Sequence, residues 1–216
     1  IHPDIRRNLL TMRALTQAAR AICLVTAREQ DIAEAGKDAE TRATAASRAA
    51  LLTPIAKAFS TDIGVEVASI GVQIHGGMGF IEETGAAQHY RDARILPIYE
   101  GTNGIQAIDL LTRKLPLDGG KVAQAYIAEL AQTAAEVAAS NRPEFGRMGE
   151  RLGAAVAALA TASRWMGGAL QTSPDAALAG AQPYLRLFGL AAGGVYLARG
   201  ALAVVREGGT DSAGRI

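Results

Sequence analysis

The sequence predicts an all-α fold, and three observations support this prediction. Apolar residues recur at gaps of three and four along most of the 216-residue chain, which is the spacing of one face of an α-helix. No stretch alternates apolar and polar residues with the period of two that is typical of a half-buried strand. Apolar residues make up 49% of the chain but aromatic residues only 5%, and a core of alanine and aliphatic side chains favours closely packed helices. We expect two small antiparallel bundles joined near Leu117.

The first predicted helix runs from Asp4 to about Glu29, and Pro3 and Asp4 suit its first turn. Its apolar face consists of Ile5, Leu9, Met12, Leu15, Ala19, Ile22 and Thr26. The following stretch, 31–47, has no large apolar residue after Ile32. We therefore predict a polar connection or a frayed helix there.

A second helix is predicted to begin at Thr53-Pro54, an N-cap followed by a first-position proline, or one turn earlier. Its apolar positions are Ile55, Phe59, Ile63, Val67, Ile70 and Ile74. Gly76-Gly77 is expected to end it, because glycine readily adopts the positive φ angle that a helix C-terminus often needs. A short helix around 82–91 is expected next, and Pro97 prevents its continuation.

A third helix is predicted from Thr102 or Asn103. Its apolar positions are Ile105, Ile108, Leu111 and Leu115. Asn103 and Gln106 have the spacing of a capping box, with Asn in place of the usual Ser or Thr. The segment 116–120, PLDGG, is the clearest linker in the chain.

Three further amphipathic stretches are predicted after the linker. The apolar positions of the first are Val122, Tyr126, Leu130, Thr133 and Val137, and those of the second, which opens after Arg142-Pro143, are Phe145, Met148, Leu152, Val156, Leu159, Met166 and Leu170. The third begins near 173–175 and runs to about Val205, with a kink or a restart at Pro183.

The longest apolar run, Leu187 to Ala198, lies within this third stretch. It is shorter than the roughly 20 residues that a membrane-spanning helix needs, so we predict a buried core helix. Gly189 and Gly193 are four positions apart in it. In such a helix they would let a neighbouring element come close.

Charge and cysteine content exclude several classes of function. The net charge of +1, from 22 basic and 21 acidic residues, provides no overall field to attract nucleic acid or an anionic membrane. The single cysteine, Cys23, cannot form an intrachain disulfide or a cysteine zinc site, and it fits a reducing compartment. We therefore expect a cytoplasmic protein. The abrupt start without an initiator methionine or a signal peptide leads us to expect part of a longer polypeptide.

The segment 73–106, QIHGGMGFIEETGAAQHYRDARILPIYEGTNGIQ, contains two glycine-bearing turns and most of the polar side chains that could perform chemistry. These side chains are His75, Glu82, Glu83, Arg91, Asp92, Arg94, Tyr99 and Glu100. The chain contains no phosphate-binding loop signature and no nucleophile elbow. The three histidines, His2, His75 and His89, lack the partners of a metal site, so each is expected at the surface or at a helix end.

Glu100 is the strongest candidate for a catalytic group. The segment 95–98, ILPI, precedes it, and apolar surroundings disfavour the charged form of a carboxylate, which suits a general base near neutral pH. Gly101 beside it leaves open space for a substrate. The alternative is that Glu100 only stabilises the N-terminus of the helix that follows. The physical argument by itself favours this alternative.

A family resemblance favours the catalytic role. QIHGGMGF, RDARI and IYEGTNGIQ occur in the order and spacing of the C-terminal helical domain of acyl-CoA dehydrogenases, and HPDIRRNLLTMRA resembles an earlier helix of that domain. This resemblance covers residues 2–115. The part after Leu117, including PYLRLFGLAAGG, resembles the helical extension of a subgroup similar to methylthiopropanoyl-CoA dehydrogenase. The implied organisation is a C-terminal helical domain in 1–116, without its start, and a helical extension in 117–216.

The resemblance implies that Glu100 removes the α-proton of an acyl-CoA thioester while FAD accepts a hydride from the β-carbon. The Glu100 N–H would donate a hydrogen bond to the thioester carbonyl, an arrangement similar to an oxyanion hole. Tyr99 and Gly101 would line the acyl site. The positions implied to contact FAD are Thr102, Asn103 and Gly104, and, for the FAD of a neighbouring subunit, Gln73, Ile74, His75, Gly76 and Gly77.

The family also implies a role in fatty acid metabolism, an assembly of at least two subunits and an electron-transfer flavoprotein as electron acceptor. Family enzymes contain an N-terminal helical domain and a middle β-domain, neither of which is in this sequence. We therefore expect this chain alone to be inactive. Two alternatives stay open: a non-catalytic helical assembly module, and a related flavin-dependent acyl-CoA oxidase.

Overall fold

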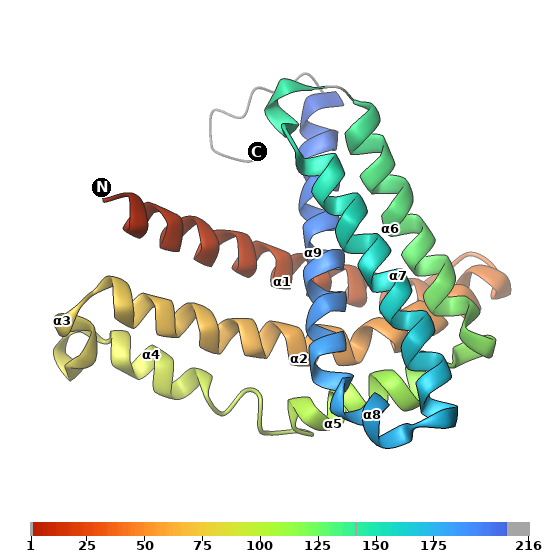
Figure 1. Ribbon diagram of the computed structural model, residues 1–216, viewed down its shortest axis with the longest axis horizontal. Helices are drawn as coiled ribbons and strands as arrows, with labels where there is room; N and C mark the ends of the chain where they lie inside the picture. Colours follow the sequence, from red (N-terminus) through yellow and green to blue (C-terminus); the bar gives the residue numbers. More distant parts are fainter. Residues whose placement is uncertain (1, 141, 207–216) are drawn as a thin grey trace.

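The computed structural model describes residues 2–140 and 142–206, and all regular elements of this part are helical (Figure 1). The prediction of an all-α fold is confirmed. Two long helices, α1 (Pro3–Ala35) and α2 (Ala39–Ile74), lie antiparallel and form one arm of the molecule. The later helices α6, α7 and α9 cross this arm, as Figure 1 shows.

The prediction of a polar connection or a frayed helix at 31–47 is wrong, because most of this stretch is regular helix. Helix α1 continues to Ala35, and only three residues separate it from α2. Asp38 caps α2, since its Oδ1 accepts a hydrogen bond from the Thr41 N–H at 2.7 Å. Ala45 and Ala49 are buried in the core. Alanine has the highest helix propensity, and its small side chain suffices where two helices pack closely.

The predicted start of the second helix at Thr53-Pro54 is also wrong, because Pro54 lies inside α2 and is buried. Thr53 does not cap the helix; its hydroxyl donates to the Ala49 carbonyl at 2.8 Å. Proline removes one helix hydrogen bond. The neighbouring Leu52 and Ile55 are fully buried, so tertiary packing maintains the helix across the proline.

Glycines separate the short elements that follow α2. Gly76, with φ +60°, ends that helix as predicted. Helix α3 (Gly77–Phe80) and the 3-10 turn η1 (Glu82–Thr84) come next. Gly85, with φ +74°, precedes α4 (Ala86–Ala93). The single short helix predicted around 82–91 is therefore split in two.

Helix α5 (Asn103–Asp109) is capped by Thr102, whose hydroxyl accepts from the Ile105 N–H at 3.4 Å. The predicted capping box on Asn103 is wrong, because its side chain turns inward to α2. Ile105 and Ile108 were expected in the core but are 55% and 40% exposed. A π-helical turn, η2 (Leu110–Lys114), then follows, and Leu110, Leu111 and Leu115 are buried.

The linker prediction agrees with the backbone at 116–120. The 3-10 turn η3 (Leu117–Gly120) contains positive φ angles at Asp118, Gly119 and Gly120. Helix α6 (Lys121–Ala139), the turn η4 (Pro143–Phe145) and helix α7 (Met148–Thr172) follow.

The break predicted at Pro183 occurs instead at Gly180, between α8 (Pro174–Ala179) and α9 (Ala181–Arg206). Pro183 lies in the first turn of α9, where a missing N–H costs little because no helical acceptor precedes it.

Helix α9 is the central core helix of the fold. By length and composition alone it could cross a membrane, but 56% of its most apolar segment is buried inside the protein. It packs on α1, α2, α6 and α7. A Cβ added to Gly189 would lie 2.3 Å from the Phe59 ring, and one added to Gly193 would lie 2.7 Å from the Ala18 Cβ. The predictions of a buried helix and of a close approach at both glycines are confirmed.

One continuous cluster of buried apolar side chains joins the two halves of the chain. Ile22 and Phe59 of the first half belong to the same cluster as Leu159 and Phe188 of the second half. The division of the chain into two domains near Leu117 stays a prediction.

Candidate active site at the Glu100 turn

Glu100 lies at the tip of a tight turn between α4 and α5. The Asn103 N–H donates to the Pro97 carbonyl at 2.9 Å and closes this turn. Before it, the Tyr99 N–H donates to the Ile95 carbonyl at 3.1 Å. The Pro97 carbonyl thus provides the acceptor that brings the chain back to α5.

The backbone of Glu100 is strained. Its φ angle is +53°, and only Asp118 shares a positive φ among the non-glycine residues that the structure describes. The left-handed conformation costs an L-residue about 1–2 kcal/mol, although Asp tolerates it better than Glu. Gly101 follows with φ +86°. A strained residue of this kind persists only where its surroundings determine its conformation, and such residues concentrate at functional sites.

Lys57 on α2 anchors the turn with two hydrogen bonds. Its Nζ donates to the Gly101 carbonyl at 2.8 Å and to the Asn103 Oδ1 at 2.9 Å. Asn103 is only 5% exposed, and its Nδ2 donates to the Ala58 carbonyl at 3.0 Å and to the Asp62 Oδ1 at 2.7 Å. Sequence reasoning missed Lys57 and Asp62, because nothing in their local pattern connects them with a turn some 40 positions away.

The contacts of Asn103 change what can be expected of it. Its side chain is engaged with α2 and its N–H with Pro97, so it does not face the outside of the protein. Its neighbours Thr102 and Gly104 are exposed. A cofactor contact stays a prediction for Thr102, Asn103 and Gly104, and the structure gives the Asn103 side chain an anchoring role.

The surface around Glu100 is open and apolar. Tyr99 is 47% exposed, Ile98 49% and Ile95 55%, and Glu100 and Gly101 are exposed too. This chain by itself therefore does not enclose the carboxylate as the apolar sequence before it suggested. Within residues 2–140 and 142–206, the N–H groups of Glu100 and Gly101 donate no hydrogen bond. Both donors are free for a ligand.

The second predicted site segment, Gln73–Gly77, lies at the far end of α2 (Figure 1). From Lys57 to Gln73 the helix rises ~24 Å, so this chain does not bring the two segments together. Ile74 is half-buried, and the other four residues are exposed. The His75 ring lies 2.8 Å from the Gly71 carbonyl, which confirms a helix-end position.

The close packing of α3 on α2 requires glycine at position 79, which the sequence did not indicate. A Cβ at Gly79 would lie 2.2 Å from the Val72 carbonyl oxygen, so α3 folds back directly on α2. By contrast, an added Cβ at Gly77 would meet no atom within 4 Å. Glycine at that position is not explained by packing inside this chain.

Two of the remaining candidate side chains pair with each other. Arg91 donates to both carboxylate oxygens of Glu82, at 2.9 and 2.8 Å. The pair is exposed and connects η1 with α4. Arg91 and Glu82 therefore form a surface ion pair, and exposed pairs of this kind contribute little to stability.

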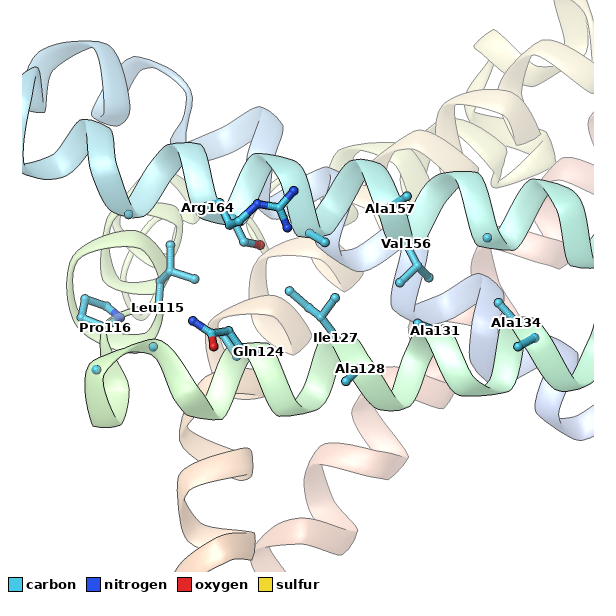
Figure 2. Close-up of a pocket in the computed structure, with 18 of the residues that line it drawn as sticks. Leu115, Pro116, Gln124, Ile127, Ala128, Ala131, Ala134, Val156, Ala157 and Arg164 are labelled. Atoms are coloured by element: carbon cyan, nitrogen blue, oxygen red, sulfur yellow. The ribbon is translucent and has the colours of Figure 1, made fainter.

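A groove lies away from the Glu100 turn, between α6 and α7 (Figure 2). Its volume is about 1070 Å³ and its walls are mainly alanine and glycine. Arg164 is the one charged side chain in its lining. No residue of the 73–106 segment contributes to it.

Comparison with protein-family models identifies the chain. The model of the acyl-CoA dehydrogenase C-terminal domain matches residues 1–115. The chain belongs to the acyl-CoA dehydrogenase family. A second model, acetyl-CoA dehydrogenase C-terminal like, matches residues 126–214. Enzymes of the acyl-CoA dehydrogenase family use FAD.

Individual relatives agree with this assignment. The chain is 50% identical to a 3-methylmercaptopropionyl-CoA dehydrogenase of Ruegeria pomeroyi over 206 residues, which is 95% of this chain and 35% of the relative. It is 36% identical to the broad-specificity linear acyl-CoA dehydrogenase FadE5 of Mycobacterium tuberculosis over 65% of this chain and 23% of the relative. The chain thus spans about a third or less of the length of these acyl-CoA dehydrogenases.

A solved structure has the same fold. The Caenorhabditis elegans protein ACDH-11, crystallised in complex with C11-CoA, superposes with a TM-score of 0.71 over 93% of this chain and 34% of its own. Its sequence identity is 21%. At this identity the likeness concerns the helical architecture alone. It confirms the predicted all-α family fold.

Proposed function

We propose that the chain is the C-terminal part of an FAD-dependent acyl-CoA dehydrogenase and that Glu100 is its catalytic base. Family membership supports the reaction class, α,β-dehydrogenation of an acyl-CoA thioester. The observation that carries the assignment to Glu100 is its left-handed backbone, with φ +53° in an exposed turn. A glutamate that only favoured a helix N-terminus would not need this strained conformation.

Two groups of the turn would act on the substrate. The Glu100 carboxylate would accept the α-proton, which needs a base within hydrogen-bond reach of the α-carbon. The Glu100 N–H, free within the described residues, would donate to the thioester carbonyl and stabilise the charge that develops on its oxygen. Tyr99 and Gly101 would line the acyl group beside this oxygen.

FAD would supply the hydride acceptor for the β-carbon. The exposed Thr102 and Gly104 at the start of α5 fit a cofactor contact, because their backbones are accessible. At the other end of α2, the absence of any atom within 4 Å of a Cβ at Gly77 leaves room for a cofactor from outside this chain. These two segments would serve the cofactors of different subunits, which requires at least a dimer.

The location, the metabolic role and the electron acceptor are also part of this proposal. We expect a cytoplasmic enzyme of fatty acid metabolism that passes its electrons to an electron-transfer flavoprotein. A related flavin-dependent acyl-CoA oxidase would differ by rapid reoxidation in air.

A non-catalytic assembly module is the second candidate function. The observation in its favour is the exposed apolar surface of α3, where Phe80 is 82% and Met78 56% exposed. A full-length protein with bound flavin that acyl-CoA reduces would exclude this candidate.

Replacement of Glu100 by glutamine in the full-length enzyme tests the proposal. The amide has nearly the shape of the carboxylate but cannot accept the α-proton, so flavin and acyl-CoA should still bind. General-base catalysis typically contributes about 10²–10⁴-fold, and anaerobic bleaching of the flavin by acyl-CoA should slow by at least this factor. Bleaching at the wild-type rate would refute the role of Glu100.

A further inference from the structure

The Glu100 turn is connected to α9, in the C-terminal half, by a chain of side-chain hydrogen bonds. Gln182, in the first turn of α9, donates from Nε2 to the Asp62 Oδ2 at 2.9 Å. The other Asp62 oxygen accepts from Asn103 at 2.7 Å. We propose that Gln182 and Asp62 are positioning residues through which the C-terminal helices hold Glu100 in place. This inference rests on the proposed function of Glu100.

Asn103 is the rigid centre of this chain of contacts. Its Nδ2 donates to Asp62, to the Ala58 carbonyl and to the Thr61 hydroxyl, while its Oδ1 accepts from the Lys57 Nζ at 2.9 Å. Both ends of the amide are thus engaged, and rotation by 180° would break these contacts. Because the side chain is buried, a lost partner would leave a polar group unpaired, which is costly.

Gln182 is held in one orientation by Asp62. Its amide nitrogen faces the carboxylate, and its Oε1 is buried without a hydrogen-bond partner among the described residues. The opposite orientation would place two oxygens against each other. A hydrogen bond to an ionised carboxylate is roughly twice as strong as one between neutral groups. The hydrogen bond to Asp62 therefore determines the orientation of the Gln182 amide, and the Gln182 Oε1 is left without a partner among the described residues.

Lys57 transmits this arrangement to the backbone next to Glu100. The same ammonium that bonds Asn103 also donates to the Gly101 carbonyl at 2.8 Å. Two anchors thus hold the turn on its C-terminal side, one on the backbone at Gly101 and one on the Asn103 side chain. Because the left-handed Glu100 backbone persists only under such constraints, loosening Asn103 would let the carboxylate shift. A shift of about 1 Å in a reacting group can cost about 10²-fold in rate.

Arg186 provides a matched control on the same pair of helices. It lies one turn after Gln182 on α9 and donates to the Glu66 Oε2 on α2 at 2.8 Å. This pair joins α9 to α2 as the Gln182–Asp62 contact does, but it has no contact with Asn103. Loss of Arg186 therefore reports the general effect of weakening the α2–α9 contact.

The first measurement is hydrogen exchange of the Asn103 backbone N–H in the 216-residue chain. This group is chosen because its hydrogen bond to the Pro97 carbonyl closes the turn. Gln182→Ala should speed this exchange about five-fold, the effect of about one lost hydrogen bond on a local opening equilibrium. Gln182→Glu should speed it further, since it places a second carboxylate against Asp62. Arg186→Ala should leave the exchange within about two-fold of wild type, as expected for an exposed pair.

The second measurement is made on the full-length enzyme. Gln182→Ala should slow anaerobic flavin reduction by about ten-fold while KM for acyl-CoA stays the same, because a displaced base affects only the transition state. Arg186→Ala should change neither value. If both variants changed exchange and reduction equally, Gln182 would only stabilise the helix packing, and the inference would be wrong.

Glu100→Gln separates this inference from the proposed function. If Glu100→Gln reduces its flavin at the wild-type rate, the proposed function fails, and the positioning role fails with it. If Glu100→Gln is inactive but Gln182→Ala exchanges and reacts like wild type, only the positioning role is overturned.

Discussion

The left-handed backbone of Glu100 predicts that glycine at this position makes the protein more stable than alanine does. A positive φ costs an L-residue about 1–2 kcal/mol, and alanine retains that cost. Glycine removes it but loses about 0.5–1 kcal/mol through the greater freedom of the unfolded chain. The net expectation is that Glu100→Gly exceeds Glu100→Ala by about 0.5–1 kcal/mol in free energy of unfolding.

A position in regular helix gives the opposite sign and serves as control. Ala158 is exposed on α7, where glycine should cost about 0.5–1 kcal/mol relative to alanine. Urea unfolding of the 216-residue chain, followed by circular dichroism, measures both differences, provided that the m-value is unchanged. If Glu100→Gly were less stable than Glu100→Ala by the amount found for Ala158→Gly, the Glu100 backbone would not be strained.

The strain also connects stability with activity. In the full-length enzyme, Glu100→Gly should be at least as stable as wild type and yet fail to reduce its flavin, since the base is gone. Asp118, with φ +48° in the linker, offers the comparison. Asp118→Gly should also be at least as stable as wild type, but with a smaller gain than Glu100→Gly, because Asp tolerates the left-handed conformation better. It should leave flavin reduction unchanged.

Three further predictions concern pH, packing and the cofactor. Burial raises the pKa of Tyr184 to about 12 from its ordinary 10.0. The unfolded chain therefore releases the Tyr184 proton at a lower pH than the folded chain does. The stability contributed by the protonated Tyr184 is complete below pH 10 and is lost as pH rises from 10 to 12. Tyr184→Phe should reduce this alkaline loss in urea titrations by up to about 1.4 kcal/mol per pH unit; an unchanged slope would contradict the burial argument. Gly189→Ala should destabilise the chain by about 1–3 kcal/mol in urea unfolding, because the new Cβ would lie 2.3 Å from the buried Phe59 ring. If this variant had wild-type stability, the two helices could separate at this position. Gly77→Val should leave the stability of this chain nearly unchanged, since no atom lies within 4 Å of the new Cβ, but should lower flavin content in the full-length enzyme; unchanged flavin content would contradict a cofactor at that position.

The sequence by itself determined the helical class, the family and part of the buried core. Periodic apolar residues predicted the buried faces of α6 and α7, because burial of one stripe per helix is a local property of the pattern. Motifs around 73–106 predicted the family that the comparisons then established. The helix end at Gly76, which has a positive φ angle, was predicted for the same local reason.

Only the tertiary structure decided the extent of α1 and α2 and the surroundings of Glu100. Alanines such as Ala45 carry little hydrophobic signal, yet they are buried where another helix comes close. Pro54 looked like a helix start because its missing N–H is a local feature, while the packing that tolerates it is not. The contacts of Asn103 with Lys57 and Asp62 join positions more than 40 residues apart. No local pattern encodes such pairs, since they form only when the turn and α2 are brought together by the folded core.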